Sequence, residues 1–143
     1  GVAAYPEKHQ DAPNIKSDIN FLKKKVEAGA EFMVTQMFFD NKKYFDFVKT
    51  CEKEGLNIPI IPGIKPLSTK KQLYTLPKIF HIDLPEDLVD AVESCKDDKQ
   101  VAEIGIEWAI KQTKELKDAG VPVLHFYTMG KSESTRKIAS AIF

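Results

Sequence analysis

Four apolar segments of the sequence each end in residues that could bind a ligand. They run into YPEKH, TQMFFD, PGIKP and HFYTMGK, motifs that contain amide, imidazole, phenol and amine groups. Gln36 is unusual because it lies among aromatic residues at the end of an apolar run. An amide neither titrates near neutral pH nor acts as a nucleophile, but it donates and accepts hydrogen bonds. Gln36 is therefore a candidate for ligand binding, although an isolated glutamine also commonly satisfies nearby backbone groups.

Other patterns argue against several kinds of chemistry. Cys51 and Cys95 lack CxxC spacing and a nearby histidine, so we expect reduced, buried thiols in a cytosolic protein. His9 has no partner at metal-ligand spacing, and we expect no metal site. His81 and His125 are interpreted as structural. Neither GxGxxG nor GxxxxGK[ST] occurs, so the glycine-rich phosphate-binding loops are not predicted.

Length and charge suit one globular domain covering residues 1–143. The 21 basic and 21 acidic residues give zero formal charge, so we expect neither nucleic acid nor an anionic membrane as a partner. We find no apolar run long enough for a membrane span and no signal peptide, which favours a cytoplasmic location. The chain opens without Met on the strand-like GVAAY, and we interpret this as a start inside a larger fold.

Strand-like and helix-like segments alternate along the whole chain. Near-continuous apolar runs predict buried strands, at Val2–Tyr5, Phe32–Phe39, Ile58–Ile61 and Val123–Tyr127. Periodic patterns with capping residues predict helices, over about Ser17–Ala28, Asp40–Glu54, a segment from Ser68 that Pro77 interrupts or ends, a segment with Pro85 in its first turn, Asp98–Ala119, and a last one from Ser132 or Ser134. This α/β order predicts a parallel sheet with right-handed crossovers.

Two architectures fit this order: an open doubly wound sheet, or part of a (β/α)8 TIM barrel. The polar or kinked residues at all four strand ends favour the barrel, since its active site lies at the carboxyl ends of the strands. A complete barrel needs about 250 residues, so four βα units are about half of one. We therefore predict a half-barrel.

The motifs VAAYPEKH, AGAEFMVTQMFFD, IIPGIKP and HFYT resemble those of the methylenetetrahydrofolate reductase family. The resemblance runs from Val2 to about Lys131, in order and at compatible spacings. It implies that the chain is the C-terminal half of the family's (β/α)8 catalytic barrel, its last four βα units. It also implies that the family's general-acid carboxylate lies upstream, so that this fragment contains no catalytic residue.

Members of this family reduce 5,10-methylenetetrahydrofolate to 5-methyltetrahydrofolate, in one-carbon metabolism and methionine supply. The resemblance thus implies an oxidoreductase that uses FAD and NAD(P)H as cofactors and methylenetetrahydrofolate as its small-molecule substrate. We also expect a homo-oligomer, and we expect the isolated fragment to be inactive.

The resemblance also assigns residues to binding roles. The positions matching cofactor contacts are Tyr5, His9, Ala12, Asp18, Lys24 and Lys25, and those matching substrate contacts are Gln36, Gln72, Leu76 and Lys131. Lys24 stands where relatives often have arginine, and Phe21 matches only weakly. Simpler interpretations exist: the lysine run is typical of a solvated helix face, and Gln72 of an exposed helical position.

An alternative function comes from the same residues. The chain could be a non-catalytic half-barrel that binds flavin or folate and self-associates. The bare edges of its first and last strands are apolar and would favour pairing with another chain.

Overall fold

The computed structural model describes residues 1–130 and 132–143, and its centre is a parallel sheet of four strands. The strands lie in sequence order, β1 (Val2–Ala4), β2 (Met33–Met37), β3 (Ile60–Ile64) and β4 (His125–Phe126). Parallel pairing aligns Ala3 with Val34, and Val34 with Ile61. The carboxyl ends of all four strands therefore lie at one edge of the sheet. The predicted α/β class and parallel sheet are confirmed.

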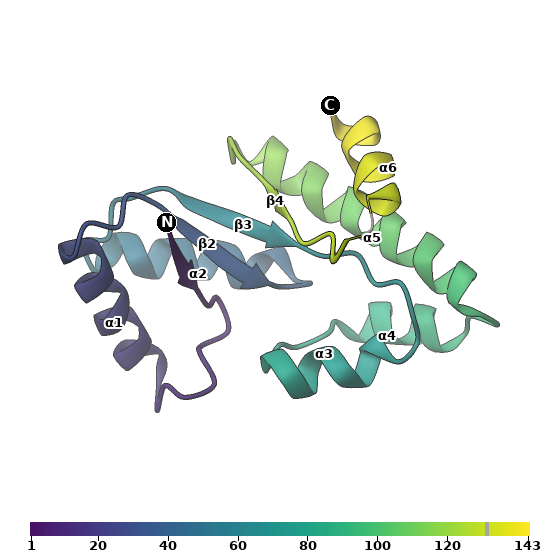
Figure 1. The fold of residues 1–143 in the computed structure, drawn as a ribbon, viewed down its shortest axis with the longest axis horizontal. Coiled ribbons are helices and arrows are strands. Elements are labelled where there is room, and N and C mark those ends of the chain that lie inside the picture. Colours follow the sequence, from purple (N-terminus) through teal and green to yellow (C-terminus); the bar gives the residue numbers. More distant parts are fainter. Residues whose placement is uncertain (131) are drawn as a thin grey trace.

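Within the described residues, six helices connect and follow the strands. Figure 1 shows their arrangement around the sheet. They are α1 (Ile15–Glu27), α2 (Asn41–Lys53), α3 (Gln72–Phe80), α4 (Glu86–Glu93), α5 (Asp98–Asp118) and α6 (Glu133–Ile142). Asn14, Asp40 and Asp97 each cap a helix by accepting a backbone hydrogen bond within its first turn. These side chains fix where α1, α2 and α5 begin.

Several predicted boundaries differ from the structure. The outer strands are shorter than expected, because β1 has 3 residues and β4 has 2. Pro77 was expected to interrupt or end its helix, but α3 begins later, at Gln72, and continues through Pro77 to Phe80. Pro77 is the sixth of the nine residues of α3, where an N–H would donate to the backbone oxygen of Leu73, so the helix continues with one backbone hydrogen bond fewer.

The two faces of the sheet have different environments. Met33, Thr35 and Met37 of β2 are buried, whereas Val34 on the same strand is only half-buried. Its register partners Ala3 and Ile61 are exposed and half-buried, respectively. One face is thus packed against helices and the other is partly exposed, an arrangement consistent with a partial barrel-like fold, although the apolar runs had predicted strands buried on both faces.

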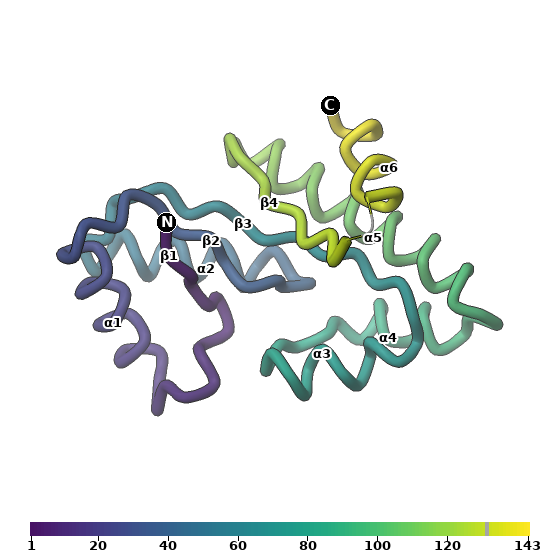
Figure 2. The backbone as a smooth tube through the Cα atoms, viewed as in Figure 1, coloured from purple at the N-terminus to yellow at the C-terminus, as the bar shows by residue number. Residues whose placement is uncertain are grey.

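The α3–α4 pair forms a separate layer. In Figure 2 the chain after β3 turns away from the sheet and places α3 and α4 beyond the carboxyl ends of the first strands. Leu73 and Leu76 of α3 pack in one hydrophobic cluster with Met37 and Phe39, at the end of β2 and just after it. This layer brings the end of α3 close to the segment after β1.

Candidate functional site at the carboxyl ends of the strands

One cavity brings together residues from three of the predicted elements. It has a volume of about 140 Å³ and is lined by Tyr5 and His9 from the β1–α1 loop, Gln36 from β2, and Phe80 at the end of α3, with Gln10 and Ile79 beside them. Three of the residues predicted to bind ligands therefore lie together, at the edge of the sheet where the motifs converge.

The β1–α1 loop is held in shape by short contacts. The rings of Tyr5 and His9 meet edge to face, with centroids 4.5 Å apart. The buried Asp18 accepts a hydrogen bond from the backbone N–H of His9 at 2.8 Å. His9 Nδ1 in turn accepts one from the backbone N–H of Asp11 at 3.1 Å. Asp18 therefore acts on the loop itself, and through it on the position of the imidazole ring.

The other predicted cofactor positions lie outside this cavity. Ala12 is buried, and its backbone oxygen accepts a 2.6 Å hydrogen bond from Lys8 Nζ. On α1, Lys25 Nζ donates to the backbone oxygen of Ala3 at 3.1 Å. Lys24 Nζ lies 5.5 Å from the centre of the Phe21 ring. Lys25 thus contacts β1, whereas Lys24 lies beside a ring of its own helix, and the roles of both lysines toward a cofactor stay predictions.

The contacts of Gln36 agree with both interpretations of this residue, hydrogen bonding to nearby backbone groups and ligand binding. Its Oε1 accepts a hydrogen bond from the backbone N–H of Met37 at 3.0 Å, beside an irregularity in the β2–β3 register. Its Nε2 makes no hydrogen bond with the described part of the chain. The amide oxygen thus satisfies local backbone, while the NH₂ group is the part available to a ligand.

Of the remaining predicted substrate positions, Gln72 and Leu76 do not line this cavity. Gln72 Oε1 accepts hydrogen bonds from the backbone N–H groups of Ser68, at 2.7 Å, and Thr69, at 3.3 Å, so it stabilises the turn before α3. Leu76 is only 5% exposed and packs in the core. Lys131 lies outside the described residues. The roles of these three residues toward a substrate stay predictions.

One residue beside the site, which lines a smaller cavity together with Tyr5 and Gln36, was not predicted. Glu7 Oε2 accepts a hydrogen bond from the backbone N–H of Asp83 at 2.7 Å and lies 3.9 Å from Lys43 Nζ. Burial raises the pKa of Glu7 to about 7, and the Asp83 N–H and the charge of Lys43 oppose that shift. The sequence offers no signal for this burial beyond the position of Glu7 in YPEKH.

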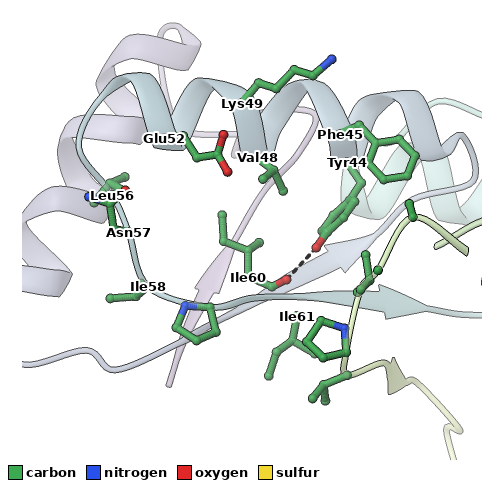
Figure 3. Close-up of a pocket in the computed structure, with 16 residues that line it drawn as sticks. Tyr44, Phe45, Val48, Lys49, Glu52, Leu56, Asn57, Ile58, Ile60 and Ile61 are labelled. Carbon is green, nitrogen blue, oxygen red and sulfur yellow. Dashed lines mark hydrogen bonds between the residues drawn. The ribbon is translucent and has the colours of Figure 1, made fainter. Parts of the chain in front are cut away.

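A second, larger cavity lies at the opposite end of β3. It has a volume of about 930 Å³ and is lined mainly by apolar residues of α2, β3 and the α5–β4 connection (Figure 3). Tyr44 spans it with a hydrogen bond from its hydroxyl to the backbone oxygen of Ile60 at 2.7 Å. Among the described residues, none of those predicted to bind a ligand lines this cavity.

Other predictions concern residues outside both cavities. Cys51 and Cys95 are free and buried, as expected. His125 on β4 is exposed, and its ring meets that of Tyr127 edge to face. Within residues 1–130 and 132–143, no group of three or more His, Cys, Asp or Glu side chains could hold a metal ion. No helix in these ranges is long and apolar enough to cross a membrane.

Comparison with solved structures supports the fold. The chain matches an uncharacterized protein from Clostridium thermocellum, described as binding two copies of 5-methyl-5,6,7,8-tetrahydrofolic acid, with a TM-score of 0.65. The match covers 98% of this chain and 51% of that protein, at 21% sequence identity. At this identity the likeness shows a shared fold.

Sequence comparisons identify the family. The chain is 41% identical over 138 residues to 5,10-methylenetetrahydrofolate reductase of Buchnera aphidicola subsp. Acyrthosiphon pisum, covering 96% of this chain and 47% of that protein. It is 34% identical to the Escherichia coli enzyme of the same name, covering 99% and 48%. Against a probable methylenetetrahydrofolate reductase (NADPH) of Caenorhabditis elegans it is 37% identical, covering 99% and 22%.

The chain therefore spans about half the length of its bacterial relatives, or less than a quarter of the nematode one. The family model for methylenetetrahydrofolate reductase matches residues 1–142, nearly the whole chain. This protein belongs to the methylenetetrahydrofolate reductase family.

Proposed function

We propose that the protein containing this chain reduces 5,10-methylenetetrahydrofolate to 5-methyltetrahydrofolate with NAD(P)H, using FAD as its flavin. The observation that carries the proposal is the meeting of Tyr5, His9 and Gln36 at one cavity, in a chain matched to the family over residues 1–142. The relatives span roughly twice this length, so the proposed activity belongs to the whole protein.

The residues present fit a flat flavin ring. Tyr5 and His9 offer aromatic edges at the carboxyl end of β1, and the open sheet face beside them carries the small or apolar side chains of Ala3 and Val34. A planar heterocycle suits such a surface, because these concave sites are mostly apolar with a few polar groups that set orientation. When bound, FAD supplies the hydride chemistry, accepting a hydride from NAD(P)H and delivering it to the folate.

In this proposal the side chains of this chain bind the folate and the dinucleotide and orient them. Gln36 Nε2 donates to an acceptor on the edge of the folate's pterin ring, while its Oε1 stays on the Met37 N–H. Asp18 keeps the loop of His9 in place through its 2.8 Å hydrogen bond. Lys24 and Lys25 offset phosphate charge on the dinucleotide. The proton donor is expected upstream of this chain.

The test uses the purified whole protein. We expect a flavin absorbance spectrum and oxidation of NAD(P)H that depends on methylenetetrahydrofolate. His9→Ala should weaken FAD binding, whereas Tyr74→Ala, at an exposed position of α3 that does not line the cavity, should not. A protein that binds no flavin under any condition would show that the proposal is wrong.

A second candidate function is folate or flavin binding without turnover by this chain alone. The likeness to a protein described as binding 5-methyl-5,6,7,8-tetrahydrofolic acid favours it. Half of the binding site of a barrel cannot hold the flavin and the substrate ring in reacting geometry, so the isolated chain should show no turnover. Titration of the 143-residue chain with FAD and with 5-methyltetrahydrofolate, alongside an NAD(P)H oxidation assay, separates binding from catalysis.

A further inference from the structure

Glu7 joins three parts of the fold that are far apart in the sequence. Its Oε2 accepts the 2.7 Å hydrogen bond from the Asp83 N–H in the α3–α4 linker. The same oxygen lies 3.9 Å from Lys43 Nζ on α2, and that amine lies 2.9 Å from Asp83 Oδ2. The β1–α1 loop, α2 and the α3–α4 linker therefore meet at one carboxyl group.

This carboxyl group is buried without being fully paired. The Glu7 side chain is only 7% exposed, and its Oε1 makes no hydrogen bond within the described residues. A buried anion with an unpaired oxygen is costly, and the neutral acid avoids most of that cost. Burial is accordingly the main reason that the pKa of Glu7 is raised to about 7.

The surroundings of Glu7 contain both signs of charge. The backbone N–H of Asp83 and the charge of Lys43 favour the carboxylate, whereas the side chain of Asp83 disfavours it. Asp40, also on the α2 side, acts on Lys43. Glu7 lines a cavity of about 10 Å³ with His81 and Ile82 of the linker, Lys8 and Tyr5 of its own loop, and Gln36. Glu7 thus shares this cavity with Tyr5 and Gln36, two of the residues proposed to touch ligands.

We propose that Glu7 is a positioning residue, whose carboxyl group holds the β1–α1 loop against the α3–α4 linker and α2 and so fixes Tyr5 and His9 for their ligand. The ligand in this inference rests on the proposed function, which assigns these two side chains to the flavin. The neutral carboxyl group holds the loop more firmly than the carboxylate, because the charged form gains water when the loop opens. Proton loss from Glu7 therefore loosens the loop.

Amide hydrogen exchange tests the tether directly, because the Asp83 N–H is the group that Glu7 binds. The protection of this amide, corrected for its intrinsic exchange rate, should fall by about tenfold between about pH 5.5 and about pH 8.5. Glu7→Gln stays neutral at both pH values and should remove this fall. Asp11→Asn should behave as the wild type, since that carboxylate is exposed. If the protection of the Asp83 amide depended equally on pH in the wild type and in Glu7→Gln, Glu7 would not be the group that holds the loop against the linker.

Flavin titration tests the positioning role. We expect Glu7→Ala to weaken FAD binding by about tenfold, as for the loss of one well-placed anchoring contact, and Glu7→Gln to preserve it at both pH values. FAD binding that is identical in the wild type and both variants would overturn the positioning role. A wild-type protein that binds no FAD would overturn the proposed function, and the exchange of the Asp83 amide would then decide the tether by itself.

Discussion

The hydroxyl of Tyr127 donates a hydrogen bond to the backbone oxygen of Thr35, 2.9 Å away, and so reaches from the end of β4 across β3 to β2. Gly63 of β3 lies beneath this contact. A Cβ atom at Gly63 would lie 2.4 Å from the Thr35 oxygen and 2.6 Å from a carbon of the Tyr127 ring. The Gly63 N–H also donates to Thr35 Oγ1 at 2.9 Å. Because Gly63 has no side chain, β2, β3 and the residue after β4 can approach one another closely here.

Gly63→Ala should lower the free energy of unfolding by about 2–3 kcal/mol, because the Thr35 oxygen belongs to the backbone and cannot turn aside. Tyr127→Phe should cost about 1 kcal/mol, the usual value for one hydrogen bond. Tyr74→Phe is the control, since Tyr74 is exposed on α3. Urea unfolding measures all three. A Gly63→Ala protein within about 0.5 kcal/mol of the wild type would contradict this account.

The sequence predicted those features of the fold that depend on neighbouring residues. Asp40 was expected to cap its helix, and its side chain accepts from the Lys42 N–H at 2.9 Å. Gly29 and Gly55 follow the ends of α1 and α2, and both have the positive φ that favours glycine at a helix end. Strand lengths were less well predicted, because a residue counts as strand only where a partner pairs with it. The run Val123–Tyr127 has such pairing only at His125 and Phe126.

The same distinction applies to the site. Gln36 and His9 could be found because each follows an apolar run within a recognisable motif. Glu7 could not, because its burial depends on Asp83, which is 76 residues away. Gln72 shows the opposite difficulty, a local structural contact that the sequence did not predict. Its residue type and position suited a ligand, but its Oε1 accepts a hydrogen bond from the backbone N–H of Ser68.

Glu7 should make global stability depend on pH. Its pKa is raised by burial from 4.5 to about 7, so the folded state binds a proton that the unfolded state releases between these values. The stabilisation is fully present below about pH 4.5 and is lost as the pH rises through about 7. After allowance for screening by water, we expect a loss of about 1–2 kcal/mol in the wild type that Glu7→Gln does not show.

Urea unfolding at several pH values, compared between the wild type and Glu7→Gln, isolates this contribution from the other titrating groups. Asp11→Asn serves as the control, because its carboxylate is exposed. Parallel stability curves for the wild type and Glu7→Gln would contradict the prediction.

The cysteines should be unreactive in the folded protein. Cys51 is fully buried, and burial raises the pKa of its thiol to about 11, with the nearby charges of Asp18 and Glu52 adding to the shift. Very little thiolate, the reactive form, is then present near neutral pH. Ellman's reagent should label Cys51 only as fast as the protein unfolds, and both cysteines at once in denaturant. Rapid labelling of native Cys51 would show that α2 opens locally.

Gln36→Ala in the whole protein should weaken folate binding by about tenfold to a hundredfold, the effect of losing about 1–3 kcal/mol of hydrogen bonding. Bound FAD should be largely unaffected, because Gln36 is assigned to the pterin edge. Steady-state kinetics with varied methylenetetrahydrofolate, together with the flavin absorbance of each preparation, measure the two effects separately. Unchanged folate kinetics, or complete loss of flavin, would show that the assigned role of Gln36 is wrong.

The open face of the sheet leads to the last prediction, the self-association of the isolated chain. Val34 and Ile61 lie half-buried on this face, and Val123 is 51% exposed in the segment leading to β4. The outer strands, with 3 and 2 residues, offer few free backbone groups for edge pairing. We therefore expect copies to associate mainly through the open face, where burial of apolar area supplies the free energy.

Val34→Lys should reduce this association, because a lysine on the face would lose its hydration at the contact. Tyr74→Lys is the matched control, since it places the same charge at an exposed apolar position on α3, away from the sheet. Light scattering across a range of concentrations measures the mass of each variant. A wild-type chain that stays monomeric at every concentration would contradict self-association. A Val34→Lys variant that associates as strongly as the wild type would instead place the contact elsewhere, with the edges of β1 and β4 as the next surfaces to test.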